Sequence, residues 1–324
     1  MAIARRITAQ QLRILCYHGF SYLDEHDFSD VLFMAPDTFD SRMNYLKTHR
    51  YPVVTLDDAI AMREAGTLPP CTTVLTFDDG WQGFADFAMP ILLSCDFAAT
   101  VYVTTYYVNH QEPVFNVFAK YCFSATERRN LSLHEISDQL QGDVGLETHA
   151  EKEKAAAIVI RYYRSVASEQ RKELWDRLRR ALSVNTPVES GAFRLMQPNT
   201  LTSMKMTGFD LQLHTHRHRF YDCDDSDAAK EIADNRNALS QIGIDHCKHF
   251  CFPSGAYHGH QLAVLRDASI VSATTTRQAL VTTNDSALEL PRILDRQQMS
   301  LLEFEAEMSG FADLLRRVRS WLIH

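Results

Sequence analysis

A predicted buried strand that ends in two carboxylates constrains the fold of this chain more than any other feature. Residues 72–77 are apolar or β-branched and uncharged, and the run stops at Asp78, Asp79 and Gly80. This pattern predicts a strand inside a sheet, followed by a turn. Successive side chains of an extended chain point in opposite directions, so the two carboxylates can serve different functions. Taken alone, Asp-Asp-Gly is more typical of an Asx-type turn than of a binding site.

Strands and helices alternate on both sides of this run. The short turns between them are typical of an α/β fold with a parallel sheet, either open or closed into a barrel. The predicted strands cover residues 12–18, 51–56, 72–77, 98–103, 209–213 and 290–293, and the predicted helices begin at 36 and 57 or cover 84–95 and 202–208.

The segment from about 109 to 198 departs from this alternation. Residues 151–182 are rich in Ala, Glu, Lys and Arg, which predicts one or two amphipathic surface helices. No Gly-, Ser- or Pro-rich linker separates the segment from its flanks, so we expect one domain, 1–324, with a helical insertion at about 109–198. The residues expected to face inward are Ile158, Tyr162, Leu174, Leu178 and Leu182.

Composition narrows the class of protein. The chain has 324 residues, of which 45% are hydrophobic, as in ordinary soluble globular proteins. Its formal charge of −8 argues against a general nucleic-acid or anionic-membrane binder, although local basic patches are compatible with it. The first residues lack the apolar stretch of a signal peptide, and no segment is long enough to span a bilayer, so we expect a cytoplasmic protein. Seven scattered cysteines without a C-x-x-C pair predict reduced, mostly buried thiols.

A cluster of histidines follows the predicted strand 209–213. His214 and His218 would lie on one side of the chain whether it stays extended or turns helical. Together with Asp79 they would form a three-ligand site that leaves one position open, which is typical of catalytic zinc. A polar exposed loop explains the cluster equally well when it is taken alone.

Two motifs resemble those of the polysaccharide deacetylases, which form carbohydrate esterase family 4 and share the NodB-homology domain. They are residues 76–80, Thr-Phe-Asp-Asp-Gly, and residues 214–218, His-Thr-x-x-His. The resemblance covers most of the chain except the insertion, and it implies a distorted (β/α)7-type barrel that removes acetyl groups from N-acetylated sugars. It extends to the flanking residues Tyr17-His18, Pro90-Ile91-Leu92, 99–103 and Phe252-Pro253-Ser254-Gly255-x-Tyr257.

The resemblance also implies a role for each matching residue. Asp78 would be the general base, and Asp79, His214 and His218 would bind one divalent metal ion whose bound water is the nucleophile. We expect zinc (Zn²⁺), with Co²⁺, Ni²⁺ and Mn²⁺ as alternatives. Thr215 would support the loop through hydrogen bonds. The residues expected to contact the sugar are Trp81, Tyr257 and His18.

The chain departs from the family pattern in two places. The third motif of the better-known members has an Arg shortly before its Pro, but residues 250–253 are Phe-Cys-Phe-Pro. We therefore expect Arg292, on the predicted late strand, to orient Asp78 through a bidentate ion pair, although a surface Arg is an equally good explanation. No His matches the last motif, which supplies the general acid in the family, so the acid is unassigned.

Three functions are compatible with the sequence. The first is a metal-dependent deacetylase whose partner is an acetylated carbohydrate, either a cytoplasmic sugar precursor or a nascent glycan. The second is an amidohydrolase that cleaves a non-sugar C–N bond, since related barrels host other C–N hydrolyses. The third is a catalytically weak carbohydrate-binding module, against which the retained Asp78 argues. The sequence specifies neither the sugar nor the oligomeric state.

Overall fold

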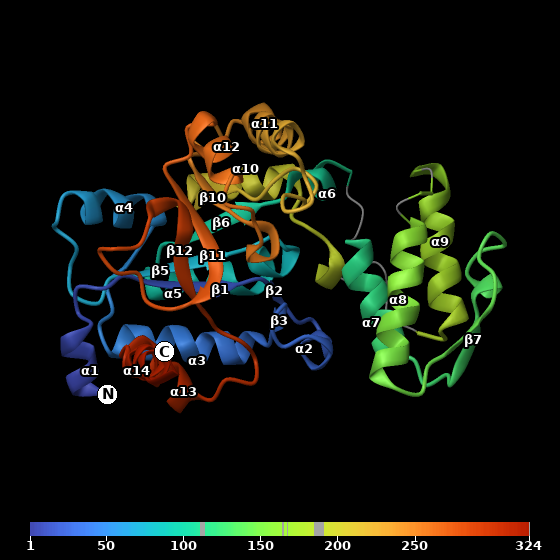
Figure 1. Ribbon diagram of the computed structural model, residues 1–324, viewed down its shortest axis with the longest axis horizontal. Helices are drawn as coiled ribbons and strands as arrows, with labels where there is room; N and C mark the ends of the chain where they lie inside the picture. Colours follow the sequence, from blue (N-terminus) through green and yellow to red (C-terminus); the bar gives the residue numbers. More distant parts are fainter. Residues whose placement is uncertain (111–113, 164, 167, 185–190, 324) are drawn as a thin grey trace. The chain divides into compact units, whose positions relative to one another are not determined.

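Seven parallel strands form a closed barrel at the centre of the protein. The computed structural model describes residues 1–110, 114–163, 165–166, 168–184 and 191–323 (Figure 1). The strands are neighbours in the order β1-β12-β11-β10-β9-β6-β5, and β1 also pairs with β5, which closes the barrel and confirms the predicted (β/α)7-type fold. The strands are β1 (Arg13–Tyr17), β5 (Thr73–Phe77), β6 (Thr100–Val103), β9 (Asp210–Leu213), β10 (His249–Cys251), β11 (Ser272–Gln278) and β12 (Leu290–Leu294).

Helices cover the outside of the barrel, with α3, α13 and α14 on one side of it and α10, α11 and α12 on the other (Figure 1). A short strand, β4 (Val53–Val54), pairs with the start of β5, and β2 (Gly19–Phe20) pairs with β3 (Phe33–Met34). The predicted helix 84–95 begins as a π-helical turn before α5. The helices are α1 (Ala2–Ile7), α2 (Glu25–Phe28), α3 (Pro36–Thr48), α4 (Leu56–Glu64), α5 (Met89–Cys95), α6 (Thr105–His110), α10 (Pro198–Met206), α11 (Asp225–Gln241), α12 (Gln261–Asp267), α13 (Leu301–Met308) and α14 (Phe311–Ile323).

The strand register brings the two predicted motifs to one end of the barrel. Every residue of β1 and β5 is buried, because parallel strands are covered by helices outside and by side chains inside. Tyr17, the last residue of β1, pairs with Phe77, the last residue of β5, and the last residues of β6 and β9 pair in the same way. The residues that follow, His18, Asp78 and His214, therefore share the carboxyl end, where (β/α) barrels form their sites.

A second compact unit, Glu112–Arg194, interrupts the chain between β6 and β9, where the sequence predicts the insertion; Met1–Gln111 and Leu195–His324 form the first unit. Its core is aromatic, with the ring of Phe115 stacked on Tyr163 at 3.7 Å between centroids. The assignment of 1–324 to a single domain stays a prediction. The elements of the second unit are α7 (Phe115–Ala125), the antiparallel strands β7 (Asn130–Ser132) and β8 (Asp143–Gly145), α8 (His149–Tyr163) and α9 (Ser168–Ala181).

The inward face of α8 is rotated by one residue from the predicted one. Ile158 and Tyr162 are half-buried, whereas Val159 and Tyr163 are buried. The Ala-rich sequence offers two nearly equivalent apolar stripes, and the stacking of Tyr163 on Phe115 selects the second. Farther along the chain, the buried residues include Leu174, Leu178 and Leu182, as predicted.

Two further expectations concern the state of the cysteines and the presence of membrane-spanning helices. All seven cysteines are free thiols in buried positions, as predicted. The thiols of two of them, Cys16 and Cys251, lie inside the barrel beside the carboxylate of Asp78. Among the described residues, no helix combines the length and the apolar character needed to cross a bilayer.

Candidate active site and metal centre

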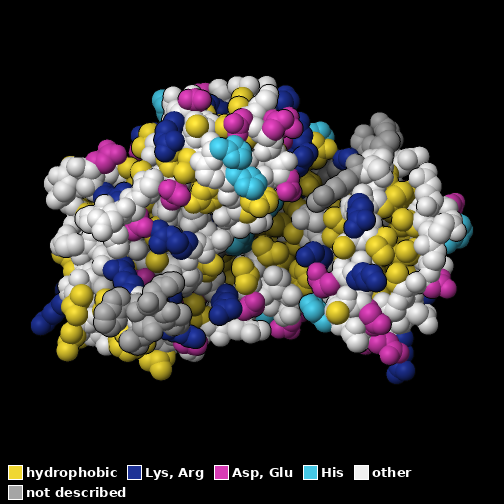
Figure 2. Space-filling view, viewed as in Figure 1, with side chains coloured by type: hydrophobic (Ala, Val, Ile, Leu, Met, Phe, Trp, Pro, Cys, Tyr) yellow, Lys and Arg dark blue, Asp and Glu magenta, His cyan; other side chains and the backbone are white. Residues whose placement is uncertain are grey.

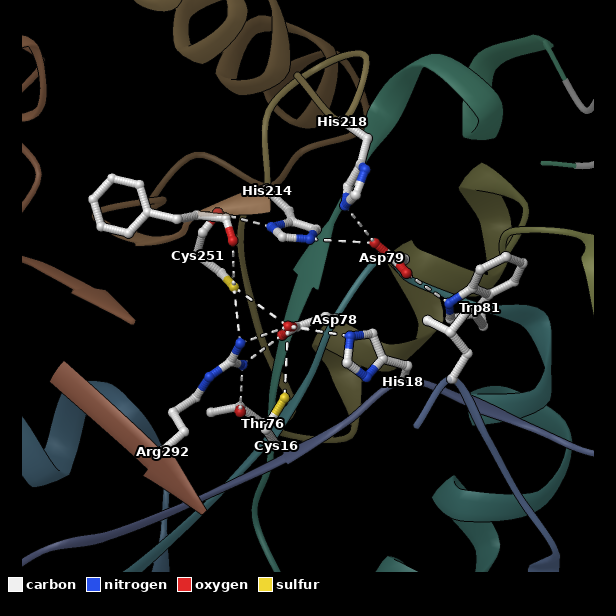
Figure 3. Close-up of polar contacts among 12 residues, drawn as sticks. Cys16, His18, Thr76, Asp78, Asp79, Trp81, His214, His218, Cys251 and Arg292 are labelled. Atoms are coloured by element: carbon white, nitrogen blue, oxygen red, sulfur yellow. Dashed lines mark hydrogen bonds and ion pairs between the residues drawn. The ribbon is translucent and has the colours of Figure 1, made fainter. Parts of the chain in front are cut away.

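The two adjacent carboxylates face different partners, as their alternation along the chain predicts (Figure 3). Arg292 binds the carboxylate of Asp78 bidentately, with Nη1–Oδ1 and Nη2–Oδ2 distances of 2.7 Å each. Asp79 instead directs Oδ1 toward the Nε2 atoms of His214, at 3.2 Å, and His218, at 3.3 Å. The backbone of Asp79 has a positive φ of 71°, which turns the chain sharply after β5 and separates the two side chains.

The donor set of Asp79, His214 and His218 fits a divalent metal ion. Its three ligand atoms lie within 4.8 Å of one another. A tetrahedral zinc site with ligands at about 2.0–2.1 Å places neighbouring ligand atoms about 3.3 Å apart, close to the observed distances. His214 Nδ1 donates to the carbonyl oxygen of Cys251 at 2.8 Å, so a neutral His214 turns the lone pair of Nε2 toward Asp79. Such an arrangement is stable only with a cation, a proton or a metal ion, between the two groups.

The pKa shifts favour the metal-binding form of two of the three donors, Asp79 and His218. Burial raises the pKa of Asp79, but the hydrogen bond with His214 and the nearby His218 outweigh it and hold the pKa well below its usual range. Burial lowers the pKa of His218, which favours the neutral ligand form at pH 7. Burial also lowers the pKa of His214, but Cys251 and Asp79 outweigh it and hold that pKa well above its usual range. A proton on His214 and a metal ion therefore compete for one position.

Asp78 is buried, and both of its carboxylate oxygens are paired. Arg292, which has no exposed surface, also donates from Nε to the carbonyl of Thr275 at 2.9 Å and from Nη1 to Thr76 Oγ1 at 3.1 Å. The thiols of Cys16 and Cys251 lie 3.7 and 3.4 Å from Asp78 Oδ2. Burial raises the pKa of Asp78, but the Arg292 guanidinium outweighs it and holds the pKa well below its usual range.

Two other groups of donor atoms in the barrel contain Asp78 and satisfy the same distance limit: Cys16, His18 and Asp78, and Asp78, His214 and Cys251. They fit a metal less well than the set on Asp79. Both oxygens of Asp78 are already engaged by Arg292. Burial raises the pKa of the Cys16 thiol well above its usual range, so it stays protonated and is a poor ligand.

His18 lies on the other side of Asp78 from Arg292 (Figure 3). Its Nε2 is 3.7 Å from Asp78 Oδ2, and its side chain is 17% exposed. Its Nδ1 is buried and has no hydrogen-bond partner among the described residues. This imidazole belongs to neither the Asp79 set nor the Arg292 pair, and so one of its nitrogens is available to another group.

Trp81 differs from its predicted role as a surface on which sugars stack. Its side chain is only 2% exposed, so neither face of the ring is open to a ligand. The indole Nε1–H donates to Asp79 Oδ2 at 2.8 Å instead, which fixes the carboxylate that faces the histidines. The residue lies beside the site but acts through Asp79.

Tyr257 is half-buried and borders a polar cavity of about 530 Å³ that Thr276, Arg277 and Asp285 also line. Its ring stacks on Phe252, with 4.2 Å between centroids. Its hydroxyl donates to Glu289 at 2.6 Å, and burial together with this carboxylate raises the pKa of Tyr257 to about 12. The contact of Tyr257 with a sugar stays a prediction.

The loop that carries the histidines is held by Asn235, which sequence patterns did not single out, and by Thr215, which the resemblance did. Asn235 on α11 accepts from the backbone N–H of His214 at 3.0 Å and donates to the carbonyl of Val103 at 2.9 Å. Thr215 Oγ1 accepts from the N–H of Arg219 at 3.2 Å, which is the loop support that the resemblance implies. Only the polar residue amid the apolar stripe of α11 hints at the role of Asn235.

A comparison with protein families agrees with this geometry. Residues 65–273 match the family model described as polysaccharide deacetylase, and the chain belongs to that family. The match includes Asp78, Asp79, His214 and His218 but ends before Arg292. A comparison with curated protein sequences found no match.

Solved structures share the fold. The chain is similar to the deacetylase PplD of Streptococcus pyogenes, with 18% identity, a TM-score of 0.63, and coverage of 92% of this chain and 98% of that one. It is also similar to IcaB of Ammonifex degensii, with 15% identity, a TM-score of 0.60, and 92% and 97% coverage. A de-N-acetylase from Aggregatibacter actinomycetemcomitans gives 12% identity, a TM-score of 0.58, and 92% and 99% coverage.

Proposed function

We propose that the protein is a metal-dependent hydrolase that removes N-acetyl groups from a carbohydrate. The observation that carries the proposal is the separation of the two carboxylates: Asp78 is held by Arg292, and Asp79 faces two imidazoles. Metal-dependent amide hydrolysis uses a base that is not a metal ligand together with a site for the metal ion. The protein PplD was solved in complex with acetate, the product that deacetylation would release, and this supports the same chemistry here.

Asp79, His214 and His218 would hold the metal ion, most suitably zinc because nitrogen and oxygen donors converge with a fourth position open. When bound, the ion would polarise the acetyl carbonyl and lower the pKa of a water molecule. Trp81 keeps Asp79 oriented for this task through its 2.8 Å hydrogen bond.

The proton transfers belong to residues of the chain. Asp78 would accept a proton from the attacking water as oxygen bonds to the acetyl carbon, and Arg292 would hold the carboxylate in place. The C–N bond then breaks, and the nitrogen must gain a proton to leave as an amine. We assign this proton to His18, because its imidazole lies 3.7 Å from Asp78 and outside the Asp79 set. The products are acetate and the free amino sugar.

We propose an acetylated sugar precursor or nascent glycan in the cytoplasm as the substrate. An amidohydrolase of non-sugar amides uses the same groups, so only a substrate survey separates the two functions.

The test is to load the purified chain with zinc and incubate it with a panel of acetylated sugars, oligosaccharides, nucleotide sugars and non-sugar acetamides, measuring free acetate. The control is the same preparation treated with chelator and dialysed. Acetate release that depends on metal supports the proposal. Release of acetate at equal rates from both preparations contradicts metal dependence, and release only from non-sugar amides contradicts the substrate class.

A further inference from the structure

Two helices from opposite ends of the described chain carry an exposed apolar surface. Ile3 and Ile7 of α1 and Phe311, Leu315 and Val318 of α14 are from 40% (Phe311) to 76% (Ile3) exposed. They line an entirely apolar groove of about 610 Å³ between the two helices. We call these five residues the apolar face. A soluble surface rarely gathers so many large exposed apolar side chains in one place without an interaction.

The apolar face is a built part of the first unit and not a frayed end. Thr8, which follows α1, donates from Oγ1 to the carbonyl of Ser309 at 3.2 Å. Arg13 of β1 donates from Nε to the carbonyl of Met308 at 2.9 Å. Arg317 of α14 donates to Gln11 Oε1 at 3.1 Å. These bonds tie the end of α1 and the start of β1 to the end of α13, and they tie α14 to the segment between α1 and β1, so the face keeps its shape.

Arginines border the apolar face. Arg6 comes three positions after Ile3 and Arg319 four positions after Leu315, spacings that place each next to its apolar neighbour on the helix surface. Both are exposed, and neither forms an ion pair within the part of the chain that the structure describes. Figure 2 shows basic and hydrophobic side chains together over α1, at the lower left of the view. This local positive charge contrasts with the formal net charge of −8.

We propose that the apolar face docks on an anionic membrane surface. The five apolar side chains would enter the boundary between headgroups and acyl chains, and Arg6 and Arg319 would contact lipid phosphates. Charge complementarity favours this partner over a second copy of the chain. A two-fold dimer through this face would place the same patch on both subunits and bring its unpaired arginines toward each other. The inference is independent of the proposed deacetylase activity and places the protein at the membrane periphery.

The test measures binding of the full chain to sedimented vesicles of phosphatidylcholine alone or mixed with phosphatidylglycerol, at low and high salt. We expect binding to the anionic vesicles only, weakened by salt because the Debye length shortens. Arg6→Glu and Arg319→Glu should each weaken binding by about fivefold or more. Ile3→Glu and Leu315→Glu should each weaken it by about tenfold or more. The matched control is Met206→Glu on α10, an 84% exposed apolar position outside the face, which should leave binding unchanged.

Several results would overturn the proposal. These are no binding to anionic vesicles, equal binding to both compositions, or a loss with Met206→Glu as large as with Leu315→Glu. A concentration-dependent dimer in sedimentation velocity that Leu315→Glu dissociates, without vesicle binding, would assign the face to a second copy of the chain. Thermal unfolding of each variant checks that it is folded. If Leu315→Glu does not fold, the arginine variants still test the proposal, because they leave the apolar packing intact.

Discussion

Each end of the barrel has a polar cluster that contains histidine, and the two clusters are built in opposite ways. At the carboxyl end, two imidazoles direct Nε2 toward a single oxygen of Asp79. At the amino end, His249 begins β10 with Nδ1 2.8 Å from Ser272 Oγ and Nε2 3.3 Å from Asp57 Oδ1. In the first arrangement the two imidazole nitrogens converge on one carboxylate oxygen. In the second, the two nitrogens of one imidazole contact two different side chains.

The difference shows why residue types alone do not identify a site. Ser272, His249 and Asp57 have the composition of a nucleophilic triad, but the serine and histidine are completely buried. Both ring nitrogens of His249 have partners in the structure, and its backbone N–H donates to Gln212 at 2.8 Å. A cluster whose atoms satisfy one another stabilises the barrel, as is typical of its amino face. Convergence of donors on a shared point marks the candidate metal site.

Replacing one histidine at each end of the barrel should give the largest difference in zinc content between the two ends. His214→Ala should remove nearly all tightly bound zinc and with it acetate release, because two donors are too few for a catalytic site. His249→Ala should keep the zinc and only lower the thermal midpoint. Elemental analysis after dialysis against chelator measures both. Wild-type zinc content in His214→Ala would remove the metal assignment.

Asp78→Asn separates chemistry from metal binding at the carboxyl end. The variant should keep its zinc, because Asp78 is not in the proposed ligand set, and lose about 10²–10⁴-fold in turnover through loss of the base. Asp79→Asn should lose both zinc and turnover. Paired measurements of zinc content and of acetate release under substrate saturation test this. Loss of zinc in Asp78→Asn together with retention in Asp79→Asn would exchange the two roles.

Arg292→Met should both destabilise the protein and move its pH profile. Leaving a buried carboxylate unpaired costs about 3–5 kcal/mol of unfolding free energy. Arg292 holds the pKa of Asp78 well below its usual range, so without it that pKa rises and the acidic limb of turnover shifts to higher pH. The wild-type pair contributes stability above the unfolded-state pKa of about 3.9, and that stability is lost as the pH falls below it. Arg292→Lys should restore only part, since a point charge lacks the bidentate fork.

A second buried pair provides the control for this variant. Arg42 Nε lies 3.3 Å from Asp295 Oδ2, and both side chains are buried. Arg42→Met should also lower the unfolding free energy, by less because burial raises the pKa of Asp295 to about 6, and it should leave the acidic limb in place. An unchanged acidic limb in Arg292→Met would show that Asp78 is not the titrating base.

Trp81→Phe should have a smaller effect, on zinc affinity at the carboxyl end. It removes the only hydrogen bond that the described residues donate to Asp79 Oδ2, and loss of such a partner typically weakens metal affinity by about 10–100-fold. Trp175→Phe in the second unit removes the indole of another buried tryptophan and should leave zinc affinity unchanged. Competition with a chromogenic chelator measures both variants. Equal affinities in the two would contradict the role assigned to Trp81.

Asp57→Asn at the amino end should have the smallest effect. Asp57 is 47% exposed and lies 2.7 Å from Lys248 as well as near His249, a geometry worth at most about 1 kcal/mol at a solvated surface. Acetate release and zinc content should not change. A loss of turnover comparable to that of Asp78→Asn would give the amino-end cluster a function beyond stability.

Much of the site was predictable because its signals are local. The run 72–77 with its two carboxylates, and the pair His214 and His218, are each readable within a few residues. Arg292 could be named only because the third motif lacks its Arg, and the structure places it on Asp78 as expected. Its catalytic role stays a prediction.

The parts that sequence patterns missed depend on contacts between distant elements. Nothing near Trp81 in the chain reveals that its indole turns inward to Asp79, and an aromatic residue after a motif suggests a sugar surface equally well. The thiol of Cys251 and its carbonyl serve Asp78 and His214 at once, which follows only from the barrel register. The hairpin of β7 and β8 within the predicted helical insertion was missed because its strands are only three residues long.

Barrel closure also determines when the candidate site can form during synthesis of the chain. Arg292 follows Asp78 by 214 residues, and its strand, β12, pairs with β1 to complete the ring. At about 5–20 residues per second, a ribosome needs roughly 10–40 s to travel between the two positions. For the last 74 residues of that interval, from His218 to Arg292, the nascent chain contains both carboxylates and both histidines but lacks the guanidinium that binds Asp78. An incomplete chain therefore cannot assemble the full candidate site, and the proposed hydrolysis would have to wait until the last barrel strand has been made.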